Sequence, residues 1–232
     1  MEAIRLRDIN IYPASSADEL IDFAVERKGI LVAVNAEKMA KATDRLSALI
    51  NDNIGYCDGS GVVLASHQKG ADRACKIAGC ELWLKIIGRY YDKSTFYFIG
   101  GRPEVFADTI VRLKKDFPGI RIVGARDGYL KTDADREALI DDVARTRPDF
   151  VFVAMGSPKQ EFLMAEMLAR HRAVYQGLGG SYDVYTGRAK RAPKWWIDHN
   201  AEFVYRLLCQ PSRIKRDLIR VKFAWWLVRK KF

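Results

Sequence analysis

The sequence lacks any run of 18 consecutive apolar residues, although 49% of its 232 residues are hydrophobic. We therefore expect no transmembrane helix. The first 20 residues also lack the long apolar stretch of a secretory signal, and we expect an ordinary first strand there. A chain of this length and composition is expected to bury one sizeable core, with a short appendage beyond it.

Cysteine and histidine are scarce and scattered. No C-x-x-C pair occurs, and the histidines lie far apart, so we expect no zinc site. Unpaired thiols in a chain without an export signal fit a reducing cytoplasm, where we expect this protein. The residues concerned are Cys57, Cys75, Cys80 and Cys209, with His67, His171 and His199.

One acidic pattern resembles a metal motif of sugar transferases. Asp133 and Asp135 form a D-x-D sequence, but Thr132 precedes them and a helical pattern follows. That arrangement is typical of a helix N-cap with acidic residues in the first turn. We therefore expect neither a metal nor any other cofactor.

The excess of positive over negative charge is confined to one end of the chain. Residues 188–232 hold 13 Lys/Arg and 3 Asp/Glu, whereas residues 1–187 hold 26 of each. Such asymmetry indicates an anionic partner for the C-terminal segment: nucleic acid, acidic lipid or phosphate. Trp225 and Trp226 lie close to Arg229, Lys230 and Lys231, a combination that favours a membrane interface. We expect both tryptophans to face lipid.

Alternating β-prone and helical segments predict an α/β fold: a Rossmann-like parallel sheet with helices on both faces. The predicted strands are Leu31–Val34, Thr95–Ile99, Arg121–Val123, Phe150–Ala154 and Ala173–Leu178, with helices at Val105–Asp116 and Asp135–Arg145. We assign 1–190 to this core and 191–232 to a basic helical appendage. In the appendage we expect one helix around Trp195–Leu208 and a second with Pro211 in its first turn.

Glycine-rich loops follow three of the predicted strands. Gly100 and Gly101, Gly156, and Gly180 with its neighbour each follow a strand and precede a helix. Glycine lets the backbone approach a phosphate, and helix N-termini favour anions, so several such loops in one sheet favour a nucleotide ligand. The loop after Val34 has no glycine, which argues against a dinucleotide-dependent oxidoreductase.

Two further patterns leave alternatives open. Asp58 lies beside two glycines, and it is either a turn residue or the general base that glycosyl transfer requires. In the last predicted helix, Arg213, Arg216 and Arg220 share one face. They form either a solvated basic face or an arginine cluster that binds a diphosphate or acidic lipid.

Several segments together resemble the WecG/TagA/CpsF glycosyltransferase family, and the resemblance covers nearly the whole chain. They are VNAEKM (34–39), DG (58–59), GRPEV (101–105), DGY (127–129), AMGSPKQE (154–161), GGSYDVYTG (179–187), KRAPK (190–194), YRLL (205–208) and QPSRIKR (210–216). The residues of these segments are most similar to those of the WecG branch. The resemblance implies transfer of N-acetylmannosaminuronic acid from a UDP-sugar to undecaprenyl-diphosphate-linked N-acetylglucosamine, as in enterobacterial common antigen synthesis.

The resemblance also implies residue roles in an inverting, metal-independent transferase. Asp58 matches the catalytic base and Gln160 a polar residue of the catalytic pocket. Arg206, Arg213 and Arg216 match arginines of an appendage that folds over the active site and holds the diphosphate. The expected substrate-binding residues are Asn35, Lys76, Gly100, Gly101, Tyr129, Gly156, Lys159, Gly180 and Asp183.

The sequence departs from the family pattern in two places. Ala33 replaces a threonine that many relatives carry, and Lys76 and Glu81 replace an arginine and an aspartate. Lysine cannot form the bidentate contacts of arginine, so we expect the sugar or diphosphate contacts at Lys76 to differ from those in these relatives. The alternatives are another UDP-sugar, such as N-acetylmannosamine or glucose, and a nucleic-acid-binding module. We expect no nucleic acid; instead we expect attachment to the inner face of the cytoplasmic membrane and regard a homo-oligomer as compatible with the sequence.

Overall fold

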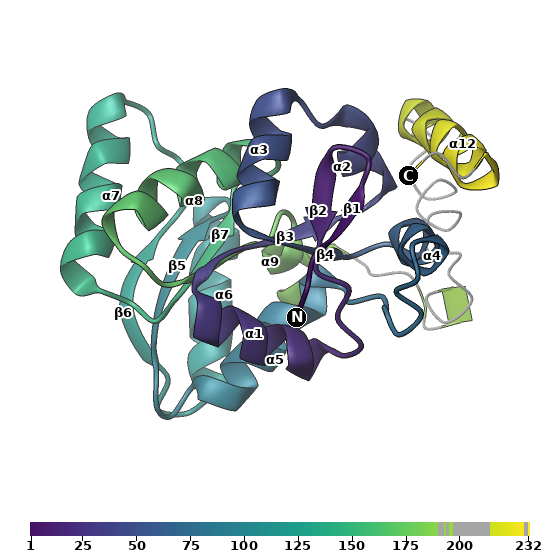
Figure 1. Cartoon of the computed structure of the whole chain (residues 1–232). Helices are drawn as coiled ribbons and strands as arrows, with labels where there is room; N and C mark the ends of the chain where they lie inside the picture. The colour runs from purple at the N-terminus through teal and green to yellow at the C-terminus, as the bar shows by residue number, and fades with distance from the viewer. Residues whose placement is uncertain (190–192, 194, 197–213, 230–231) are drawn as a thin grey trace.

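The structure is a computed structural model that describes residues 1–189, 193, 195–196, 214–229 and 232 (Figure 1). Among these residues, no helix combines the length and the apolar character that crossing a bilayer requires. The predicted boundary between 190 and 191 and most of the predicted helix Trp195–Leu208 lie outside the described residues, as does Pro211.

Six parallel strands form the central sheet in the order β4-β3-β8-β7-β5-β6, which confirms the predicted α/β class. The strands are β3 (Gly29–Val34), β4 (Ile54–Cys57), β5 (Thr95–Gly100), β6 (Arg121–Arg126), β7 (Phe150–Ala154) and β8 (Val174–Gly177). A small antiparallel hairpin, β1 (Ile4–Leu6) and β2 (Ile9–Ile11), precedes them. The predicted strands are confirmed within a few residues, and β4 is an additional one.

Helices cover both faces of the sheet, as predicted (Figure 1). One buried cluster includes side chains from α2 (Ala36–Lys41), α3 (Asp44–Asp52), α4 (Ser60–Gln68), α7 (Asp133–Thr146) and α8 (Lys159–Arg170). The other includes side chains from α1 (Ala17–Arg27), α5 (Gly79–Tyr90), α6 (Pro103–Asp116) and α9 (Ser181–Tyr185). Strand side chains alternate between the two clusters, so that Val32 lies in the first and Leu31 in the second.

The start of α7 confirms the cap interpretation of the D-x-D sequence. The Thr132 hydroxyl accepts from the Asp135 backbone N–H at 3.0 Å, and the Asp135 carboxylate accepts in return from the Thr132 N–H at 3.1 Å. This reciprocal capping box satisfies two N–H groups at the start of the helix. Asp135 also pairs with Arg126 at 3.2 Å, so its carboxylate is engaged in holding the helix start.

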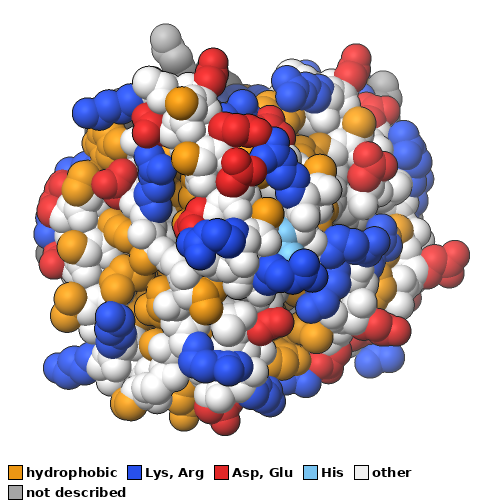
Figure 2. Space-filling view, turned by 90° about the vertical axis from the view of Figure 1, so that its left-hand side faces the viewer, with side chains coloured by type: hydrophobic (Ala, Val, Ile, Leu, Met, Phe, Trp, Pro, Cys, Tyr) orange, Lys and Arg blue, Asp and Glu red, His pale blue; other side chains and the backbone are white. Residues whose placement is uncertain are grey.

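Acidic and basic side chains are interspersed on the face formed by α7 and α8 (Figure 2). Arg136 of α7 pairs with Glu166 of α8 at 2.5 Å, and Arg170 of α8 pairs with Asp141 of α7 at 2.5 Å. This balance agrees with the zero net charge of residues 1–187.

The last helix, α12 (Ile214–Val228), packs against α2 and α4. Phe223 and Trp226 are buried in the same core cluster as the side chains of α2 and α4. The Arg7 guanidinium lies 4.0 Å from the centre of the Trp226 ring. The Gln68 side chain also donates to the Leu227 carbonyl at 3.1 Å. The described part of the appendage is therefore joined to the core by packing and by polar contacts.

The expectation that both tryptophans face lipid is wrong for Trp226. Its side chain is only 7% exposed, whereas that of Trp225 is 47% exposed. Trp226 follows Phe223 by three residues, so the two share the buried face of α12, while Trp225 lies about 100° around the helix. Adjacency in sequence therefore separates the two rings onto different faces.

Candidate active site

A cleft of about 310 Å³ opens at the carboxyl ends of β3, β4 and β8. β3 and β8 pair side by side, but the helices that follow them pack on opposite faces, with Met39 of α2 in one cluster and Tyr182 of α9 in the other. Where neighbouring connections diverge in this way, a parallel sheet leaves a crevice for a ligand. We call this crevice the β3–β8 cleft.

Asp58 lines the cleft from the loop between β4 and α4. Its carboxylate oxygen Oδ1 accepts from the backbone N–H of Gly79, the first residue of α5, at 2.8 Å. The Gln176 side chain donates to the Gly79 carbonyl at 2.9 Å and holds that residue from the opposite side. A carboxylate is favoured at a helix N-terminus. One oxygen of Asp58, Oδ1, is thus fixed by the backbone at the start of α5.

Tyr56 lies beneath Asp58 but is unsuited to accept a proton. Burial raises the pKa of the Tyr56 hydroxyl well above its ordinary value, and the negative charge of Asp58 adds to this effect. The phenol therefore stays neutral, and Asp58 is the acidic side chain on this side of the cleft.

Gln160 lies opposite, in the first turn of α8, and is buried. Its Oε1 accepts from the Gly179 N–H at 3.1 Å, and its Nε2 donates to Glu161 Oε1 at 3.4 Å. Both contacts require the same orientation of the amide. A Cβ atom at Gly177 would lie 2.3 Å from Gln160 Nε2, so glycine at 177 makes room for this amide.

Lys38 and Glu161 form an ion pair that our sequence reasoning did not assign to the site. Lys38 Nζ lies 2.6 Å from Glu161 Oε1, and the two side chains are 11% and 1% exposed. Lys38 lines the cleft. Both residues belong to segments that carry the family resemblance, but they lie 123 positions apart, so no spacing pattern in the sequence pairs them.

The cleft brings together five of the predicted site residues: Asn35, Asp58, Lys76, Gln160 and Gly180. Asn35 is also the N-cap of α2, where its Oδ1 accepts from the Lys38 N–H at 3.0 Å. The predicted Gly156 and Lys159 do not line the cleft. Gly156 precedes the lining residue Ser157 in the connection between β7 and α8, and Lys159 is the first residue of α8.

Three further predicted residues, Gly100, Gly101 and Tyr129, lie at or just after the ends of β5 and β6, outside the cleft lining. Gly100 has φ +109°, and a Cβ atom there would lie 2.3 Å from the Ala154 carbonyl oxygen of β7. The Gly128 N–H donates to the Gly101 carbonyl at 3.0 Å, which joins the loops after β6 and β5. Tyr129 follows Gly128 and is 54% exposed. We call this region the β5–β6 rim.

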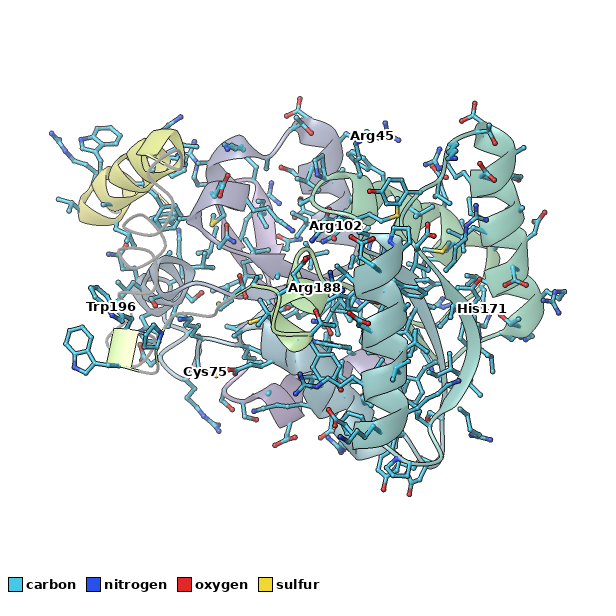
Figure 3. The ribbon with its side chains drawn as sticks, turned by 180° about the vertical axis from the view of Figure 1, so that it is seen from behind. Arg45, Cys75, Arg102, His171, Arg188 and Trp196 are labelled. Atoms are coloured by element: carbon cyan, nitrogen blue, oxygen red, sulfur yellow. The ribbon has the colours of Figure 1, made fainter. Side chains whose placement is uncertain are left out.

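Asp183 of α9 connects to this rim through Arg102. Arg102 pairs with the Asp183 carboxylate at 3.3 Å. Arg102 and Arg188 lie on the same side of the molecule, next to α9 (Figure 3). The α9 segment thus reaches from the cleft, which Ser181 and Val184 line, to the β5–β6 rim.

The predicted appendage arginines are not placed. Arg206 and Arg213 lie outside the described residues, and Arg216 belongs to α12 but its side chain lies outside them too. Within the described part of the chain, no group of three or more His, Cys, Asp or Glu side chains is arranged to hold a metal ion.

The geometry thus combines a fixed carboxylate, a fixed amide and a cleft at the carboxyl edge of a parallel sheet. The sequence model of the glycosyl transferase WecG/TagA/CpsF family matches residues 4–232, which is nearly the whole chain. The protein therefore belongs to the WecG/TagA/CpsF family and is a glycosyltransferase.

Proposed function

We propose that this glycosyltransferase moves N-acetylmannosaminuronic acid, or a related sugar, from a UDP-sugar to undecaprenyl-diphosphate-linked N-acetylglucosamine. The product would be an intermediate of a surface polysaccharide such as enterobacterial common antigen. The observation that carries the chemistry is the Asp58 carboxylate, which lines the cleft with Oδ1 held by Gly79. The family and the resemblance to its WecG branch support the choice of sugars.

In the proposed reaction, Asp58 acts as the general base. It accepts the proton of the acceptor hydroxyl, whose oxygen then forms a bond to the anomeric carbon of the donor. The bond from that carbon to the diphosphate oxygen breaks on the opposite face, so configuration inverts and UDP departs with the bonding electron pair. The Gln160 amide, which also lines the cleft, is placed to hydrogen-bond the sugar.

The departing diphosphate requires positive charge that the described cleft supplies only in part. Lys38 and Lys76 line the cleft, but Asp58 lines it too and Glu161 neutralises Lys38. Lys76 is then the cation best placed to meet a phosphate. The proposed remainder comes from Arg206, Arg213 and Arg216 of the appendage, which would stabilise the developing charge without a metal.

We place the donor across the carboxyl edge of the sheet. Its sugar would occupy the β3–β8 cleft between Asp58 and Gln160, and its uridine would extend toward the β5–β6 rim. The exposed Tyr129 ring at that rim is suited to stack on a base. The glycines at the rim allow close backbone approach to the diphosphate.

The proposed membrane contact is on the outer face of α12. Trp225 is half-exposed and Val228 is 81% exposed, and Lys222 and Arg229 are exposed beside them. Leu64 of α4, the helix against which α12 packs, is exposed as well. Aromatic and basic side chains suit an anionic lipid surface, which would keep the enzyme at the cytoplasmic leaflet where its acceptor lies.

A donor panel tests this proposal directly. Purified protein is incubated with undecaprenyl-diphosphate-N-acetylglucosamine, or a shorter prenyl analogue, and with UDP-linked N-acetylmannosaminuronic acid, N-acetylmannosamine or glucose in turn. We expect mass spectrometry to detect a disaccharide product with the uronic acid donor and without added metal. Product from another donor alone would reassign the sugar, and product from none would contradict the proposal.

A further inference from the structure

We propose that the buried Lys38–Glu161 ion pair is a positioning device that sets the orientation of the Gln160 amide for glycosyl transfer. The inference rests on the proposed function, because it takes the β3–β8 cleft as the place of transfer. Neither of these two charged side chains takes part in bond making or bond breaking in the proposed reaction.

The pair bridges two connections that flank one strand. Lys38 lies on α2 after β3, Glu161 lies on α8 after β7, and β8 runs between these two strands. The ion pair therefore spans the end of β8, where Gly177 leaves room for the Gln160 amide. This placement ties the two sides of the cleft together directly beside the amide.

Glu161 Oε1 contacts both Lys38 and Gln160. It lies 2.6 Å from Lys38 Nζ and accepts from Gln160 Nε2 at 3.4 Å. The other oxygen, Oε2, is buried without a hydrogen-bond partner among the described residues. The charge of Glu161 is therefore balanced by Lys38, and the oxygen that Lys38 holds is the one that accepts from Gln160.

The orientation of the amide follows from these contacts. Gly179 N–H requires an oxygen at one end of the Gln160 amide, and Glu161 requires an N–H at the other. A reversed amide would set its oxygen against a carboxylate and its N–H group against an N–H, leaving buried polar groups unpaired at high cost. The pair thus keeps one N–H of Gln160 on Glu161 and the other for the cleft.

The double variant distinguishes positioning from direct binding. Lys38→Met leaves Glu161 buried without its cation, and Glu161→Gln leaves Lys38 without its anion; each loss is severe because a buried charge becomes uncompensated. Lys38→Met/Glu161→Gln removes both charges, while the amide oxygen introduced at position 161 can still accept from Gln160. We therefore expect partial rescue in the double variant.

In steady-state kinetics, we expect each single variant to lose about 100-fold in kcat, the scale of a displaced reacting group. The donor KM should change little. The double variant should regain about tenfold relative to either single variant, because it leaves no uncompensated buried charge at the pair. Lys41→Met is the matched control, because Lys41 of the same helix forms an exposed pair with Glu37 at 2.7 Å; it should keep the wild-type kcat.

A second readout does not depend on turnover. In protein labelled with ¹⁵N at glutamine side chains, the Gln160 NH₂ signals are identified by their loss in Gln160→Met. They should shift or broaden in the single variants, return toward wild-type positions in the double variant, and stay unchanged in Lys41→Met. This measurement remains decisive if the wild-type protein turns over no UDP-sugar. If one single variant fails to fold, the other single variant is compared with the double variant.

Two results would overturn the inference. A rise in donor KM with unchanged kcat in Lys38→Met, without rescue in the double variant, would mean that Lys38 binds the donor directly. Gln160 signals that stay at wild-type positions in the folded single variants would mean that the pair only stabilises the fold.

Discussion

The β3–β8 cleft and the β5–β6 rim lie along the same edge of the sheet, yet they are built differently. In the cleft, the functional groups are side chains whose atoms are held by the backbone or by each other, as Gly79 holds Asp58 and Gly179 holds Gln160. At the rim, backbone packs directly against backbone, as where Gly100 lies against Ala154. The large side chain at the rim, Tyr129, is exposed.

This difference suits the division of tasks that we propose, with bond breaking in the cleft and nucleotide binding at the rim. Bond breaking needs groups held in a narrow range of positions, since small displacements cost large factors in rate. Holding a flexible nucleotide requires contact area and access to backbone N–H groups, which glycine loops and an exposed ring provide. We therefore expect cleft substitutions to lower kcat and rim substitutions to raise the donor KM.

The largest expected effect comes from Asp58→Asn in the cleft. The substitution keeps the shape and the acceptor for Gly79 N–H but removes the base. We expect kcat to fall by about 100-fold to 10,000-fold, the range for loss of acid–base catalysis, with UDP affinity nearly unchanged by calorimetry. Asp52→Asn, at an exposed position, is the control. Turnover by Asp58→Asn close to the wild-type rate would remove Asp58 from the mechanism.

The next largest effect is expected at the buried face of α12. Phe223→Ala removes an aromatic side chain that is 2% exposed and lies against Gly61 at the start of α4. Loss of such a side chain costs about 3 kcal/mol or more, so α12 should detach. Limited proteolysis should then cut the tail faster, and turnover should fall because the appendage arginines no longer reach the diphosphate.

Trp225→Ala is the matched control for α12, because Trp225 is exposed on the same helix. It should leave proteolysis and turnover of a short-chain acceptor unchanged while weakening binding to anionic vesicles. If Phe223→Ala protein keeps full turnover although its tail is cut rapidly, the leaving group is stabilised from within the core. Deletion of all residues after Arg220 would not separate detachment of α12 from loss of vesicle binding, because it also removes the buried side chains Phe223 and Trp226.

A smaller effect is expected from Tyr129→Ala at the rim. Loss of a ring that stacks on a base costs about 1–3 kcal/mol, so the donor KM should rise about tenfold while kcat stays near the wild-type value. Steady-state kinetics with the donor varied measure both constants. Tyr129→Phe keeps the ring and should restore the KM. A fall in kcat at constant KM would place Tyr129 with the cleft residues and contradict the proposed division of tasks between cleft and rim.

The smallest effect is expected at the start of α7, away from both regions. Thr132→Ala should lower the free energy of unfolding by about 1 kcal/mol, the usual cost of a lost N-cap, without changing kcat. Hydrogen bonds from Thr132, and then from Arg126, lower the pKa of Asp135. Its stabilising contribution is therefore present above about pH 4 and is lost as pH falls below that. A strict requirement for added Mg²⁺ or Mn²⁺, abolished by EDTA, would contradict the interpretation of this segment as a cap alone.

The sequence predicted much of the fold because its strands are short apolar runs bounded by glycine or charge. β7 was predicted with the same ends as observed, Phe150–Ala154. β4 was not predicted as a strand, because its run of four residues is short and is interrupted by Gly55, and glycine is depleted in strands. Its position follows from pairing with β3, which is a tertiary contact.

The sequence predicted part of the site, and the part that it missed depends on tertiary contacts. Asp58 and Gln160 stand out through their segments, and both line the cleft. The Lys38–Glu161 pair joins residues 123 positions apart, so only the sheet order β3-β8-β7 reveals it. The burial of Trp226 likewise depends on where α12 packs, which composition and charge do not encode.

The most direct test of the central claim is a crystal structure of Asp58→Asn protein with an intact UDP-sugar. We expect the sugar ring to lie in the β3–β8 cleft between residue 58 and Gln160, with the uridine extended toward Tyr129. A sugar bound at the β5–β6 rim, out of reach of residue 58 and of Gln160, would contradict it.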